Sequence, residues 1–281
     1  MSSEVVAKRG VTAVVLRVLV YALVIGLAIT MLFPFAWTLL TSITPGANLA
    51  TAPNLDPSAW SFDSYVTLFG RLNMPTYIVN SVVVAAATTV FQLVTGATAA
   101  YAFARISFPA RNVIFVCYLA TMMIPIQVAI VPLFVQMRAL GLNDSYFALI
   151  APSAASALSI FILRQAMLSI PRVLDAAAAI DGAGHIRIFT TVILPLTKPA
   201  LATVGILVFL GSWNSFLWPL VVVRNDALRT LPLGLSSLQG LYSSDWSVVL
   251  AGSVVSILPV LVLFVFAQRY FVAGIAGTGI K

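Results

Sequence analysis

Few side chains of this sequence could take part in acid–base or metal chemistry. Its 281 residues include eight acids, one cysteine (Cys117) and one histidine (His185). These are too scattered to supply the three or four converging ligands that a zinc site needs. No stretch matches the G-x-x-x-x-G-K-[ST] loop that cradles the phosphates of ATP. The sequence therefore predicts a chain that is not an enzyme, with no catalytic residue, no metal site and no ATPase site of its own.

Neutral polar residues inside the apolar runs are more informative. Amides and hydroxyls can hydrogen-bond a polyhydroxylated solute without carrying charge, and an aromatic face can stack on a sugar ring, although the same groups also hold membrane helices together. We predict four residues of this kind along a substrate path: Asn80, Gln127, Trp213 and Asn214. Further neutral polar groups of the same runs are Gln92, Ser153, Ser156 and Ser159.

The elements that carry these groups are long apolar segments. The chain is 61% hydrophobic and 8% charged, whereas a soluble domain is about 45–50% apolar and about 25% charged. A membrane-spanning helix needs about 20 mostly apolar residues. Six runs qualify: Ala13–Leu40, Tyr77–Phe103, Val113–Val135, Tyr146–Met167, Leu201–Val223 and Trp246–Gln268. They predict an all-α, polytopic membrane protein in which residues 1–281 form one transmembrane domain with six helices.

The basic residues predict the orientation of these spans. Six spans put both termini on one side, and that side carries eleven of the fifteen Lys and Arg residues. By the positive-inside rule this side is cytoplasmic. The net charge of +7 is therefore interpreted as positive charge retained on the cytoplasmic side of the membrane, and not as a sign of nucleic-acid binding. The first run is longer than the ~7–15-residue core of a signal peptide, so we expect it to be retained as a span.

The connector at residues 171–199 has the pattern of a helix–turn–helix. Pro171 suits the start of a helix, Asp175 lies near its positive end, and Gly182 is a typical C-terminal stop. A second short helix is expected from His185 to Thr191. Its alanine-rich surface fits a groove on another protein, and the alternative is a helix that lies on the bilayer.

This connector resembles the EAA loop of permease subunits in ATP-binding-cassette importers, most closely the smaller maltose-type permease of carbohydrate uptake. The resemblance is carried by Asp181-Gly182-Ala183, Phe189 and Leu194-Pro195, and it extends to Ala100–Arg105 and Gln268–Phe271. The ATPase-coupling residues that it implies are Asp175, Ala176, Ala177, Ala178, Asp181, Gly182, Ala183, His185 and Phe189. The glutamate that names the loop is replaced by Ala176, and Asp175 one position earlier either reaches a basic group of the partner or leaves that contact absent.

The resemblance also implies the surroundings of the chain. It predicts a subunit of an ATP-driven importer for a sugar or sugar-like solute in a prokaryotic inner (cytoplasmic) membrane. Its partners would be a homologous sister permease, an ABC ATPase dimer that binds ATP and Mg, an extracytoplasmic solute-binding protein, the solute and membrane lipid, and no nucleic acid. A secondary carrier or channel for a neutral polar solute is the alternative, but ion-coupled carriers usually need ionisable groups within the membrane, and these spans offer none near their centres.

Overall fold

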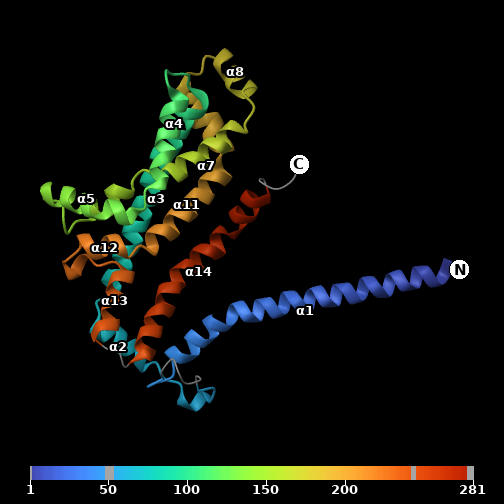
Figure 1. The fold of residues 1–281 in the computed structure, drawn as a ribbon, viewed down its shortest axis with the longest axis vertical. Coiled ribbons are helices and arrows are strands. Elements are labelled where there is room, and N and C mark those ends of the chain that lie inside the picture. The colour runs from blue at the N-terminus through green and yellow to red at the C-terminus, as the bar shows by residue number, and fades with distance from the viewer. Residues whose placement is uncertain (1, 48–53, 242–244, 277–281) are drawn as a thin grey trace. The chain divides into compact units, whose positions relative to one another are not determined.

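The computed structural model describes residues 2–47, 54–241 and 245–276, and every regular element in these ranges is a helix (Figure 1). The predicted all-α class is thereby confirmed. The chain divides into two compact units. The first comprises Met1–Arg71 and Leu238–Val255, and the second comprises Leu72–Ser237 and Ser256–Lys281.

The first unit contains a long apolar helix with little of its own chain around it. Helix α1 spans Ser2–Ser42, and its described side chains from Val14 to Ala36 are all exposed. Short helices η1 (Pro57–Ala59) and α2 (Asp63–Arg71) follow. The hydroxyl groups of Ser42 and Tyr65, 2.9 Å apart, link the end of α1 to α2. An apolar surface of this length needs lipid or another apolar chain as its surroundings.

The second unit is built around α3 (Met74–Arg105), against which α7 (Ala157–Leu168) and α11 (Lys198–Trp213) pack (Figure 1). Small residues allow the close approach, as is usual between membrane helices. A Cβ added at Gly96 would lie 3.4 Å from Cδ1 of Leu163 on α7, and one at Gly205 would lie 3.5 Å from Cδ1 of Leu93 on α3. Ala100 and Ala104 of α3 are fully buried in the same core.

The remaining helices connect and flank this core. They are α4 (Arg111–Ala120), η2 (Thr121–Met123), α5 (Ile126–Ala139), α6 (Tyr146–Ile150), η3 (Ala151–Ser153), α8 (Val173–Ile180), α9 (His185–Ile188), the π-helical η4 (Phe189–Ile193), α10 (Leu194–Leu196), α12 (Leu217–Val222), η5 (Asp226–Leu228), α13 (Leu231–Leu241) and α14 (Trp246–Ala276). Three helices in the described ranges are long and apolar enough to cross a membrane, and the number rises to six if each of three bent pairs counts as one span.

The third predicted run is not a straight helix. Residues Arg111–Met123 and Ile126–Ala139 meet at 98°. Proline disfavours helical geometry in the residue before it and offers no backbone N–H, and Ile124 and Pro125 both have extended backbone angles. The run predicted from Val113 to Val135 is therefore divided into two helices at Ile124 and Pro125.

The fifth predicted run ends too late. Helix α11 stops at Trp213, and the residues up to Val222 form the separate helix α12. Asn214 has left helical geometry, and its side-chain amide donates to the carbonyl of Leu210, 2.8 Å away, in the last turn of α11. Asparagine competes with the helical backbone in this way, and α11 ends where this hydrogen bond forms.

Candidate functional site

The connector between α7 and α11 forms a compact helix–turn–helix, which we call the coupling element (α8, the turn at residues 181–184, and α9). Gly182 has a φ of +79°, which favours glycine because it lacks a Cβ. The amide of Gly182 donates to the carbonyl of Ala179 (3.0 Å), and that of Ala183 donates to Ala178 (2.9 Å). This pair of bonds is a Schellman ending, so the turn has one defined geometry.

The tips of the coupling element are apolar and exposed. Ile180 is 87% exposed and Ile186 is 82% exposed. Phe189, in contrast, is half-buried, with its ring centroid 5.0 Å from that of Tyr101 on α3. Of the residues predicted to couple, the exposed ones are Ala176, Ala177, Asp181, Gly182 and His185, and those packed on the core of the chain are Ala178, Ala183 and Phe189. The element thus has an inner face that packs on its own chain and an outer face left open.

An arginine at the end of α3 fixes the coupling element from within the chain. Nε of Arg105 lies 3.2 Å from Oδ2 of Asp175, and Nη2 of Arg105 donates to the carbonyl of Ile170 over 2.8 Å. The side chain of Arg105 is 5% exposed and that of Asp175 is 21% exposed. Arg172 donates in return to the carbonyl of Ala104. We call Arg105, Asp175 and Ile170 the arginine clamp; it links the end of α3 to α8 and to the segment that precedes α8.

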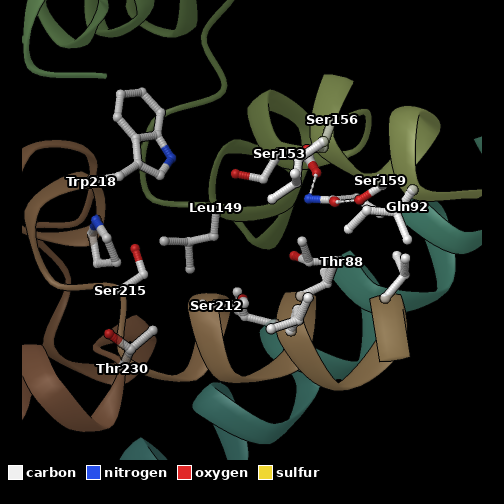
Figure 2. A pocket seen from close by; sticks show the side chains of 18 residues that line it. Thr88, Gln92, Leu149, Ser153, Ser156, Ser159, Ser212, Ser215, Trp218 and Thr230 are labelled. Atoms are coloured by element: carbon white, nitrogen blue, oxygen red, sulfur yellow. Dashed lines mark hydrogen bonds between the residues drawn. The ribbon is translucent and has the colours of Figure 1, made fainter. Parts of the chain in front are cut away.

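A separate pocket opens among the packed helices of the second unit. Its volume is about 250 Å³, and its lining comes from α3, the segment from α6 to α7, the segment from α11 to α12, and Thr230 (Figure 2). None of the described residues that line it is charged. The polar ones are Thr88, Gln92, Ser153, Ser156, Ser159, Ser212, Ser215 and Thr230, and Trp218 supplies an aromatic ring.

A hydrogen-bond network holds one wall of this pocket. The side-chain amide of Gln92 donates to the carbonyl of Ser153 over 2.6 Å, and its oxygen accepts from the Ser159 hydroxyl over 2.9 Å (Figure 2). Trp218 donates through Nε1 to the carbonyl of Ala148, 2.9 Å away. Buried polar groups that are satisfied in this way give a rigid wall.

The residues predicted for the substrate path lie outside this pocket. Trp213 is 1% exposed and donates through Nε1 to the carbonyl of Ser256, while its ring stacks on Phe209. Asn214 and Gln127 are exposed, on the end of α11 and on α5 respectively. Their role in solute contact stays a prediction, and the structure gives each of them a place apart from the hydroxyl groups of the pocket.

Asn80 has a positioning contact that the sequence did not indicate. It is 2% exposed, and its amide donates to the carbonyls of Ala227 and Arg229, both at 2.9 Å. Ser81 accepts from the amide of Leu231 over 2.7 Å. The segment between η5 and α13 is thereby held on α3, and this places Thr230 in the lining of the pocket.

The sequence indicates Gln92, Ser153, Ser156 and Ser159 as polar groups of the apolar runs, but not the other half of the polar lining, which is Thr88, Ser212, Ser215 and Thr230. A spacing signal was available, because residues three or four positions apart share a face of a helix. Thr88 and Gln92 are four apart on α3 and show this signal, whereas Ser212 lies in the last turn of α11 and Ser215 follows the end of that helix.

Comparisons with known proteins find relatives over most of the chain. Residues 92–276 match the family described as "Binding-protein-dependent transport system inner membrane component". The arabinooligosaccharides transport system permease protein AraQ of Bacillus subtilis (strain 168) is 40% identical over 259 residues, which cover 91% of this chain and 92% of AraQ. The trehalose/maltose transport system permease protein MalG of Thermococcus litoralis is 34% identical over 271 residues, which cover 94% of this chain and 97% of MalG.

A solved structure also matches over most of the chain. It is a bacterial ABC transporter involved in the import of the acidic polysaccharide alginate, with a TM-score of 0.79 and 28% identity. The match covers 91% of this chain and 96% of the solved one.

Proposed function

The chain belongs to the family of binding-protein-dependent transport system inner membrane components, and we propose that it is the transmembrane permease subunit of an ATP-driven importer for a sugar or sugar-like solute. The similarity to AraQ and MalG over more than nine-tenths of each chain supports the sugar class. The observation that carries the coupling role is the rigid helix–turn–helix with its outer apolar face open and its inner face fixed to α3.

The coupling element would seat in a cleft on an ABC ATPase dimer, which binds the ATP and Mg that this chain has no motif to hold. Closure of the ATPases on ATP would draw this coupling element toward that of a sister permease. Through the arginine clamp the movement would reach α3, and the passage would open toward an extracytoplasmic solute-binding protein. In physical terms, nucleotide binding biases a two-state membrane element through contacts that differ between its states.

We place the coupling element and both termini in the cytoplasm of a prokaryotic cell, with the spans in its inner membrane. Arg105 ends α3 and Arg111 begins α4, while Arg172 directly precedes the coupling element and Arg187 lies within it. The positive-inside rule assigns such a concentration of arginine to the cytoplasmic side. The exposed apolar surface of α1 is available to lipid and to the sister permease.

Changing both exposed tips, Ile180→Asp with Ile186→Asp, should release the ATPase subunits and abolish uptake. Both side chains are more than four-fifths exposed, so their loss should leave the fold of the chain intact, while two charges in an apolar docking cleft would be desolvated without partners. Co-purification of ATPases with the tagged permease from detergent, followed by uptake in proteoliposomes, measures both effects.

Leu55→Asp is the matched control, because Leu55 is 71% exposed and lies in the connector expected on the opposite side of the membrane. It should retain the ATPases. Normal ATPase retention and uptake in the double variant would refute docking through these tips. Uptake by the wild type without ATP would identify a carrier or channel instead.

Gly182→Val should uncouple the importer while leaving it assembled. No atom lies within 4 Å of a Cβ built at Gly182, so the substitution creates no clash and acts only on the backbone, at about 1–2 kcal/mol for a left-handed residue with a Cβ. We expect uptake per ATP hydrolysed to fall several-fold. Gly182→Asn should fall much less, because asparagine tolerates this conformation, and equal losses in both variants would contradict the argument.

A further inference from the structure

We infer that the hydroxyl-lined pocket of the second unit is a subsite of this chain for one ring of a neutral, polyhydroxylated solute. The inference rests on the proposed function as a sugar permease and adds where the solute binds. Its central residues are Thr88 on α3, Ser212 in the last turn of α11, Ser215 just after that helix, Thr230 and the ring of Trp218.

The contrast between two neighbouring threonines of α3 carries the argument. The hydroxyl of Thr89 donates to the carbonyl of Ala85 over 2.7 Å, which is how a threonine in an apolar helix usually satisfies itself. Thr88 is 2% exposed, and its buried hydroxyl has no hydrogen-bond partner in the described part of the chain. A buried polar group without a partner is costly, so Thr88 is expected to have one in a functional state.

Three further hydroxyl groups around the pocket make no hydrogen bond within the described ranges, and one of them is buried. The hydroxyl of Thr230 is buried and also lacks a partner among the described residues. Those of Ser212 and Ser215 make no hydrogen bond within the described ranges, although both residues are half-buried. Figure 2 shows hydroxyls from separate helices around one space. Hydroxyl groups that both donate and accept, arranged around a cavity, match the hydroxyl groups of a sugar ring.

The lining also limits the charge and the size of the solute. A carboxylate or phosphate would enter without a cationic partner, because every described lining residue is uncharged, and an unpaired charge at membrane depth is expensive. The volume of about 250 Å³ lies just below the ~300–1,000 Å³ of typical small-molecule pockets. It suits a single ring of an oligosaccharide or a small solute, with the indole of Trp218 as a rigid wall.

The test measures equilibrium binding to the assembled importer, trapped with ATP by an inactivating substitution in the ATPases and freed of binding protein. Radiolabelled maltose, lactose and arabinotriose are the probes. Thr88→Val with Ser212→Ala removes two hydroxyls at nearly constant volume. Each lost hydrogen bond should weaken binding about three- to tenfold, so the dissociation constant of the double variant should rise by at least tenfold.

Thr89→Val and Thr98→Val are the matched controls, because both hydroxyls donate to the carbonyl four residues earlier in α3. They should bind within twofold of the wild type. An unchanged dissociation constant in an assembled double variant would overturn the inference, as would a wild-type complex that transports a probe but binds none in this state. A wild-type importer that neither binds nor transports any of the probes would overturn the sugar class itself, and the inference with it.

Discussion

Replacing Arg105 by methionine is expected to abolish solute-stimulated ATP hydrolysis and to reduce uptake more than tenfold. The substitution keeps most of the side-chain length but leaves the Asp175 carboxylate without its ion-pair partner and the Ile170 carbonyl without its donor. Removing one partner of a buried ion pair costs about 3–5 kcal/mol, and the lower end applies here because Asp175 is 21% exposed. The coupling element would then move without pulling α3. Uptake and ATPase activity in proteoliposomes, with ATPase retention as the check on assembly, measure this uncoupling.

Three companion variants separate positioning from mere charge. Arg105→Lys keeps the charge but not the planar fork that reaches both Asp175 and Ile170, so it should recover only part of the coupling. The charge-reversed pair, Arg105→Asp with Asp175→Arg, should couple better than either single reversal. Arg138→Met, at an exposed arginine of α5, should behave as the wild type. Full coupling in assembled Arg105→Met would show that the clamp does not transmit movement.

The coupling element was predictable because its signals are local. A proline before the helix, an early acid and a glycine at its end specify a helix–turn–helix without reference to the rest of the chain. The internal ion pair was not predictable in the same way. Arg105 and Asp175 meet only because α3 and α7 pack side by side, and the sequence left open whether Asp175 would face a partner protein.

The substrate path shows where residue type stops being informative. Asn80 is a neutral amide, as a solute contact requires, yet its side-chain nitrogen donates two hydrogen bonds to the segment that carries Thr230, and its oxygen accepts one from the Tyr146 hydroxyl. Thr88 and Thr89 are identical in the sequence, but one satisfies its own hydroxyl and the other does not. Only the orientation of each side chain about its helix shows whether it holds another segment, as Asn80 does, bonds to its own helix, as Thr89 does, or lacks a partner among the described residues, as Thr88 does.

The apolar runs that can form spans were predictable from the sequence, but the bends and ends of the helices within them were not. Hydropathy over about 20 residues finds apolar runs, and it does not register the two extended residues at Ile124 and Pro125 that turn the chain by 98°. The same averaging carried the fifth run past Asn214, because one polar residue scarcely changes the mean of an apolar window.

Gly234→Val is expected to prevent most of the protein molecules from folding and joining an assembled complex. A Cβ at this position would overlap Cδ2 and Cε2 of the Tyr77 ring. That ring cannot step aside cheaply, because Tyr77 is 1% exposed and its hydroxyl donates to Oδ1 of Asp226 over 2.8 Å. Overpacking a core usually costs about 1–3 kcal/mol and sometimes more, and a rigid aromatic partner puts this site at the upper end. Complex yield and thermal inactivation in detergent measure the loss.

The smaller change Gly234→Ala tests whether the clash or the loss of glycine is responsible. Combined with Tyr77→Ala, which removes the overlapping ring, Gly234→Ala should regain part of the stability that it loses alone, even though the bond to Asp226 is gone. Gly26→Ala in α1, where nothing lies within 4 Å of an added Cβ, should be neutral or slightly stabilising because alanine favours helices. If Gly234→Ala lowers stability in the wild type but not in the Tyr77→Ala variant, the clash with the Tyr77 ring is responsible. This result would establish that α13 is held against α3 by this contact. That contact, together with Asn80 and Ser81, sets the position of Thr230, so a packing defect at Gly234 should also weaken solute binding in whatever fraction assembles.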